Sequence, residues 1–147
     1  MTSAFTIDRV LFAADLSKAC EPALRCAASV ASRFHAQLYL LHVVPAGTDA
    51  SGARARPNGV TDERRALAAM SQLRAKLIGA HEDSMLAVLS GDPAERILRK
   101  AQDIRADLIV MGGSPRGDTR RSAVTDAVVR RASCPVLTVP LVSRERP

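Results

Sequence analysis

The sequence predicts one α/β domain in which a five-stranded parallel sheet carries helices on both faces. Five short apolar runs alternate with segments whose apolar residues recur at helical spacing. The runs are continuously apolar, as expected of strands that are buried on both faces. The length of 147 residues fits one domain, which we assign to residues 1–147. Because strand and helix alternate throughout, the connections are expected to be right-handed crossovers.

The first strand is predicted at residues 10–14, where Val-Leu-Phe-Ala-Ala forms an apolar run. Ser17 is expected to cap the helix that follows, because serine is favoured at helix starts. A second strand follows at residues 37–44 and ends before Pro45. The apolar positions of the intervening helix recur at helical spacing: Ala23, Cys26, Ala27, Val30, Ala31 and Phe34.

Residues 46–60 show no apolar period and are rich in Gly, Ala, Arg, Asp, Pro and Asn, so they are expected to form a variable loop. Thr61 is predicted to cap a second helix. A third strand is expected at residues 85–89. One face of the second helix is predicted to carry Leu67, Met70, Leu73 and Leu77.

A capping box is predicted after the third strand. Asp92 is the expected N-cap, Pro93 the first helical residue, and Glu95 the residue that completes the box. The helix that begins here has its apolar residues at Ile97, Leu98, Ala101 and Ile104.

The last third of the chain contains two more strands, predicted at residues 107–111 and 136–139. The first of them ends in Gly112–Gly113. A short helix is expected between them and ends before Cys134–Pro135, and residues 142–147 form a tail. The apolar positions of that short helix are Val124, Ala127 and Val128.

The net charge of +6 is carried mainly by arginine, which supplies 18 of the 21 basic residues. Basic charge suggests anionic partners. However, the chain has no tryptophan and one tyrosine, and no aromatic residues lie between the arginines. Because a base-stacking surface needs such aromatic residues, dedicated nucleic-acid binding is not expected.

Cysteine usage argues against a disulfide framework or a zinc site. The three cysteines, Cys20, Cys26 and Cys134, form no CxxC pair and are expected to be free thiols. No apolar run approaches the roughly 20 residues that span a bilayer. The start of the chain also lacks a basic segment followed by an apolar stretch, so a cytoplasmic location without membrane insertion is expected.

Candidate binding residues follow the strands, because ligands of open parallel sheets bind beyond the carboxyl ends of the strands. Asp15 follows the first strand and is either a capping carboxylate or an acceptor for a base or ribose. Residues 112–117 join a strand to a helix and combine glycines with Arg116, which suits an anion. The alternative is a solvated loop.

The residues form no recognisable catalytic set. The three histidines match neither a Ser-His-Asp arrangement nor a His-Glu-x-x-His motif. Thr125 and Asp126 are interpreted as structural features of the last helix. We therefore predict no catalytic residue and no metal site.

Five segments in order resemble the universal stress protein family. They are Val10–Ser17, Leu41–Val44, Gly91–Leu98, Ala106–Gly112 and Cys134–Val139, and the resemblance covers about residues 8 to 141. It implies an adenine nucleotide alpha hydrolase-like fold with strand order 3-2-1-4-5. It also implies homodimers that pair through the last strand, which consists here of Val136, Leu137, Thr138 and Val139.

The resemblance also implies a nucleotide site. Some members of the family bind ATP through a motif in which a glycine is followed by two residues, a second glycine, nine residues, and Gly-Ser or Gly-Thr. Here Pro115 stands at the second glycine and Ala13 replaces a common proline. The phosphate half is therefore degenerate, whereas the adenosine half matches. The implied nucleotide-binding residues are Ala13, Asp15, Val43, Met111, Gly112, Arg116, Ser122, Ala123 and Val124.

Three functions follow from these observations. The first is a stress-response regulatory domain that binds ATP or another adenine nucleotide. The second is a nucleotide-free dimeric interaction module of the same family. The third is a slow ATP hydrolase, for which neither a placed base nor a metal site can be assembled from the sequence.

Overall fold

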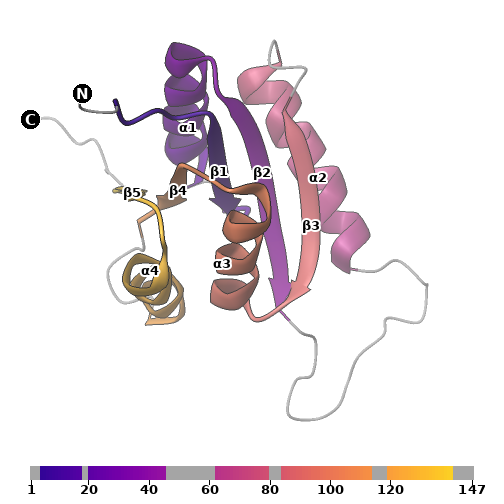
Figure 1. Ribbon diagram of the computed structural model, residues 1–147. Helices are drawn as coiled ribbons and strands as arrows, with labels where there is room; N and C mark the ends of the chain where they lie inside the picture. The colour runs from indigo at the N-terminus through magenta and orange to yellow at the C-terminus, as the bar shows by residue number, and fades with distance from the viewer. Residues whose placement is uncertain (1–3, 18–19, 46–61, 80–83, 114–118, 141–147) are drawn as a thin grey trace, which may run out of the picture.

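The computed structural model describes residues 4–17, 20–45, 62–79, 84–113 and 119–140 (Figure 1). The predicted loop at 46–60, the cap Thr61, the tail at 142–147 and Arg116 lie outside the described residues. The elements are β1 (Arg9–Ala14), α1 (Cys20–Phe34), β2 (Gln37–Pro45), α2 (Asp62–Ile78), β3 (Met85–Gly91), α3 (Pro93–Ile104), β4 (Leu108–Gly112), α4 (Thr119–Arg131) and β5 (Val136–Val139).

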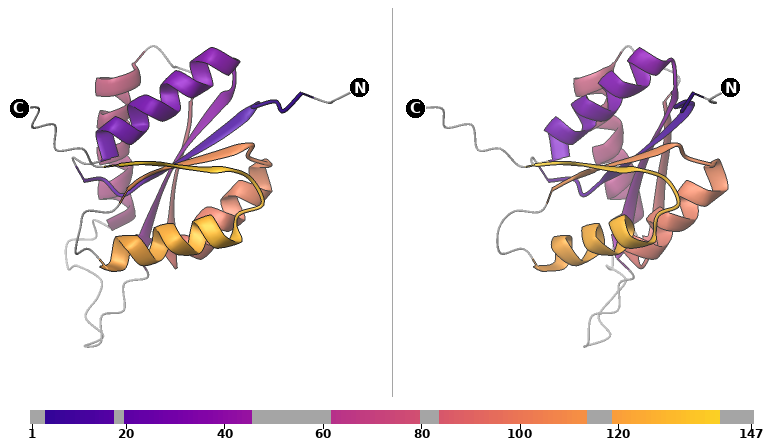
Figure 2. Two further views of the ribbon diagram at one scale, coloured as in Figure 1. Left: turned by 90° about the vertical axis from the view of Figure 1, so that its left-hand side faces the viewer. Right: turned by 60° about the vertical axis from the view of Figure 1, so that its left-hand side comes forward.

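The five strands form one parallel sheet in the order β3-β2-β1-β4-β5, which confirms the expected order. Helices α1 and α2 cover one face of the sheet, and α3 and α4 cover the other (Figure 2). The chain first winds from β1 toward β3 and then returns to the other side of β1. The point where the winding direction changes therefore lies between β1 and β4.

Successive residues of β1 enter the two halves of the core in turn. Val10 and Phe12 pack in the cluster beneath α1 and α2, and Leu11 and Ala13 pack in the cluster beneath α3 and α4. Val10, Leu11 and Phe12 are fully buried. Each large apolar side chain buried in this way contributes about 1.5–3 kcal/mol. A continuous apolar run is thus what a central strand of this sheet requires.

One residue of each of two predicted helix faces lies outside the core. Phe34 and Leu67 were expected in the core but are 51% and 46% exposed. Phe34 is the last residue of α1, and in α2 the neighbouring Ala66 turns inward with Met70. The buried face of α1 is made largely of small side chains, which let the helix lie close to the sheet: Cys20, Ala23, Leu24, Ala27, Ala28 and Ala31.

The N-cap and the first helical residue of α3 are as predicted. Asp92 is the N-cap, with extended backbone angles, and its carboxylate accepts a hydrogen bond of 3.0 Å from the backbone N–H of Glu95. Pro93 is the first helical residue. The helix ends at Arg105, whose φ of 55° is left-handed and whose N–H bonds back to Ala101 and Gln102. A cap of this kind usually uses glycine, because glycine has no Cβ to disfavour positive φ.

Asp107 was expected to begin the fourth strand, but β4 starts one residue later. Its carboxylate instead accepts hydrogen bonds from the backbone N–H groups of Asp8 at 2.8 Å and Arg9 at 3.0 Å. Its own N–H donates to the carbonyl of Arg9 at 2.8 Å. The aspartate therefore joins the start of β1 to the start of β4.

Removal of the α3 cap gives a direct test of this local structure. Asp92→Ala should lower the free energy of unfolding by about 1 kcal/mol, because the N–H of Glu95 loses its acceptor. The melting temperature should fall by roughly 2–4 °C. Urea denaturation and thermal melts measure both quantities. Asp103→Ala is the matched control: this exposed aspartate lies near the carboxyl end of α3, where the helix dipole disfavours negative charge. If both variants lost the same free energy of unfolding, Asp92 would not stabilise the protein as a helix cap.

Candidate functional site

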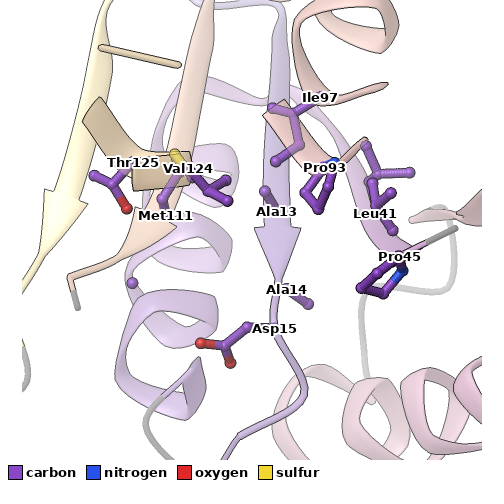
Figure 3. Close-up of a pocket in the computed structure, with 12 residues that line it drawn as sticks. Ala13, Ala14, Asp15, Leu41, Pro45, Pro93, Ile97, Met111, Val124 and Thr125 are labelled. Atoms are coloured by element: carbon purple, nitrogen blue, oxygen red, sulfur yellow. The ribbon is translucent and has the colours of Figure 1, made fainter. Parts of the chain in front are cut away.

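A pocket of about 210 Å³ opens at the carboxyl ends of β1, β2 and β4 (Figure 3). Its position agrees with the rule that open α/β sheets bind ligands where the winding direction changes. Twelve residues line it: Ala13, Ala14, Asp15, Leu41, Val43, Pro45, Pro93, Ile97, Met111, Gly112, Val124 and Thr125.

The pocket exists because β1 ends in small residues. The ladder between β1 and β4 stops at the pair Ala13–Met111. The side chain of Ala13 lies between the residues of the two walls and extends only one carbon atom from the backbone (Figure 3). A larger side chain at this position would occupy the pocket, so Ala13 keeps the space open.

The two walls face each other across Ala13 (Figure 3). One wall contains Met111 of β4 and the neighbouring residues Val124 and Thr125 of α4, and the other contains Leu41, Pro45 and Pro93. Almost all of these side chains are apolar. The arrangement suits a flat, mostly apolar ring held between two apolar walls.

Asp15 provides the polar group at the end of β1. Its Oδ1 accepts hydrogen bonds from the N–H of Ser17 at 2.9 Å and from the Ser17 hydroxyl at 2.6 Å. Between them, Leu16 has a left-handed φ of 63°, which is strained for a residue with a large side chain. The Ser17 hydroxyl donates to Asp15, and the Ser17 carbonyl accepts from the N–H of Cys20 at 3.1 Å; a side-chain cap by Ser17 stays a prediction, because residues 18 and 19 lie outside the described part of the chain.

Cys20 lies beneath this turn and is buried and free. Burial, together with the nearby charge of Asp15, raises the pKa of its thiol from 9.0 to about 11, although the backbone N–H groups of Leu16 and Asp15 oppose the shift. A thiol with this pKa stays protonated at neutral pH and is a poor nucleophile. Cys20 therefore acts as a core side chain.

Six of the nine implied nucleotide-binding residues line the pocket, namely Ala13, Asp15, Val43, Met111, Gly112 and Val124. The structure does not bring Ala123 to it: this residue is exposed on α4. Ser122 lies within α4 rather than in a loop, since the helix begins at Thr119.

Sequence reasoning missed six lining residues: Ala14, Leu41, Pro45, Pro93, Ile97 and Thr125. Leu41 could have been found, because strand alternation places it on the same face as Val43. Ile97 was assigned to the core and Thr125 to a structural role in the last helix. Nothing in the sequence shows that α3 and α4 approach the same strand ends.

Among the residues that the structure describes, no three potential metal-ligating side chains gather in one place. None of the helices in the described ranges is both long enough and apolar enough to cross a membrane.

The fold and the pocket define an open α/β domain of the kind that binds ligands beyond the carboxyl ends of its strands. The model of the universal stress protein family matches residues 6–140, so the chain belongs to this family. No curated protein sequence matches the chain.

Three solved structures illustrate the likeness. The universal stress protein UspA from Lactobacillus plantarum is 28% identical, with a TM-score of 0.69 over 91% of this chain and 98% of that one. A universal stress protein in complex with cAMP is 19% identical, with a TM-score of 0.73 over 93% and 99% of the two chains. One from Archaeoglobus fulgidus in complex with dAMP is 21% identical, with a TM-score of 0.66 over 92% and 99%.

The raised pKa of Cys20 predicts a loss of stability at alkaline pH. The unfolded thiol ionises near pH 9.0 and the folded thiol only near pH 11, so the stabilisation is complete below pH 9 and is lost as the pH rises to about 11. The free energy of unfolding should therefore fall more steeply across this range in the wild type than in Cys20→Ala. Denaturant titrations at several pH values measure the difference. Cys26→Ala, at a half-buried position, is the control and should retain the steep fall.

Proposed function

We propose that this protein is a regulatory domain that binds an adenine nucleotide, chiefly through the adenosine part. The observation that carries the proposal is the apolar pocket between β1 and β4, where the winding direction of the sheet changes. Ala13 and Ala14 lie at its base, and Asp15, the next residue, adds a carboxylate to its lining. An aromatic base fits between apolar walls, and a carboxylate can accept hydrogen bonds from a base or ribose. Two solved structures with the same fold are complexes with cAMP and dAMP, which supports the choice of an adenine ligand.

The size and charge of the pocket favour the nucleoside part over the phosphates. About 210 Å³ lies below the roughly 300–1,000 Å³ that is usual for complete small-molecule sites. Within the described lining of the pocket, no side chain is positively charged, and Asp15 adds negative charge. These features give a triphosphate no electrostatic advantage inside the pocket itself.

The phosphates would lie beyond Gly112, toward the amino end of α4. Arg116 would supply a cationic donor there, and Ser122 and Ala123 belong to the proposed phosphate end. The first turns of a helix offer free backbone N–H groups and a positive dipole end, which favour an anion. Salt would weaken contacts between arginine side chains and the phosphates, because screening reduces the attraction between charges that face solvent.

Calorimetric titration with ATP, AMP and adenosine tests this assignment. The Kd of AMP should lie within about tenfold of that of ATP, a difference of roughly 1.4 kcal/mol, because the shared adenosine supplies most of the affinity. The remaining preference for ATP should shrink as salt is added. A thousandfold, salt-insensitive preference for ATP would mean that a complete phosphate cradle forms.

Two variants locate the binding site. Ala13→Leu should abolish binding of all three ligands while leaving the melting temperature near the wild-type value, because the new side chain fills the pocket. Asp15→Asn should weaken adenosine binding about tenfold while keeping an oxygen that can accept from Ser17. Full affinity in Ala13→Leu would place the ligand elsewhere.

A second role is as a dimeric interaction module, and one observation favours it. Among the strands that the structure describes, β5 lies at an edge of the sheet and pairs with β4 alone. Its Leu137 is 37% exposed. Apolar edge strands are usually paired or covered, so we propose that β5 pairs with its counterpart in a second copy.

Light scattering at micromolar concentration tests the dimer. The wild type should have twice the mass of the chain, and Leu137→Asp should have the mass of a single chain, because a charge would be placed within the interface. Leu67→Asp alters a leucine that is exposed on α2, a helix that packs on β2 and β3 toward the other edge of the sheet from β5 (Figure 1), and this variant should remain dimeric. A wild-type monomer would exclude this role.

A further inference from the structure

One side chain interacts directly with the carboxyl end of the central strand. His42 lies on β2 and is paired with Ala14 of β1 in the sheet register. Its Nδ1 is 2.7 Å from the carbonyl oxygen of Ala14. Because a carbonyl oxygen can only accept, Nδ1 must carry the proton and donate it. The imidazole is half-buried, so water competes only partly for this bond.

The Ala14 carbonyl marks the point where β1 leaves the sheet. The ladder with β4 ends one residue earlier, at Ala13–Met111, and Ala14 is the last residue paired with β2. Beyond this point the sheet no longer determines the path of the chain. The bond from His42 therefore acts on the last peptide group before Asp15.

The turn that follows contains a strained residue. Leu16 has a left-handed φ of 63°, which a leucine seldom adopts. Such backbone persists only where the surroundings enforce it. Hydrogen bonds flank this residue, from Ser17 to Asp15 on one side and from His42 to Ala14 on the other, and the Leu16 side chain packs against the core.

His42 does not itself line the pocket. Side chains alternate along β2, and its neighbours Leu41 and Val43 pack with the cluster beneath α3 and α4, where the pocket lies. His42 therefore projects toward the layer of α1 and α2. An effect of His42 on a bound ligand would have to pass through the backbone of β1.

We propose that His42 is a positioning residue: its bond to the Ala14 carbonyl sets the direction in which β1 leaves the sheet and so holds the Asp15 carboxylate at the pocket. The part that concerns ligand affinity rests on the proposed nucleotide site. The part that concerns the turn does not, because it can be measured in the ligand-free protein.

Nuclear magnetic resonance of the ligand-free protein tests the turn. The nitrogen spectrum should show His42 protonated at Nδ1. The amide of Ser17, which donates to Asp15, should exchange with solvent at least tenfold faster in His42→Leu. In His42→Asn the exchange should stay near the wild-type rate, because the asparagine Nδ2 can donate from almost the same place. An unprotonated Nδ1, or unchanged exchange in His42→Leu, would overturn the proposal whether or not a nucleotide binds.

Val88→Ala is the matched control. Val88 is the residue of β3 that pairs with His42, and it packs on the same side of the sheet. Its truncation should lower the melting temperature but leave Ser17 exchange and ligand affinity within twofold of wild type. Faster Ser17 exchange in Val88→Ala, equal to that in His42→Leu, would show that His42 acts only through general stability.

A double-mutant cycle with adenosine tests the link to the ligand. His42→Leu should raise the Kd about tenfold in the wild type but less than twofold in Asp15→Asn, because there the carboxylate that it positions is already lost. If His42→Leu raised the Kd by the same factor in the wild type and in Asp15→Asn, the proposal that His42 acts by positioning Asp15 would be overturned. If the wild type binds no adenosine, the proposed function fails, and the exchange data alone decide the role of His42 in the turn.

Discussion

The structure depends on β1 being buried on both faces and paired on both edges. This strand bonds to β2 and to β4, and its side chains enter both halves of the core. Beyond the end of β1, the segments that follow β2 and β4 lead to helices on opposite faces of the sheet (Figure 2). Among the segments that the structure describes, none therefore covers the carboxyl end of β1 on both sides. The pocket is the space that this divergence leaves.

Small residues keep that space from being filled. Ala13 and Ala14 end the strand, whose earlier residues Val10, Leu11 and Phe12 are large. An apolar space of about 210 Å³ leaves the surrounding side chains without packing partners on one side. A flat ligand would restore those contacts, which is a physical reason for a domain of this design to be more stable when occupied.

Aspartates secure the joints between the elements by accepting hydrogen bonds from backbone N–H groups. Asp107 accepts at the start of β1, Asp15 at its end, and Asp92 at the start of α3. The ion pair between Lys76 and Glu21 is partly exposed to solvent, and such pairs contribute little.

The sequence by itself determined the succession of strands and helices, the α3 cap and the polar position after β1, because each depends on residues close together in the chain. The resemblance to the family added the strand order. The tertiary structure decided that Ala66 rather than Leu67 turned inward on α2, and it brought Ile97 and Thr125 to one pocket from separate helices. It also placed His42 against Ala14 across two strands. Such contacts depend on helix phase and strand register, which are set by packing between segments far apart in the sequence.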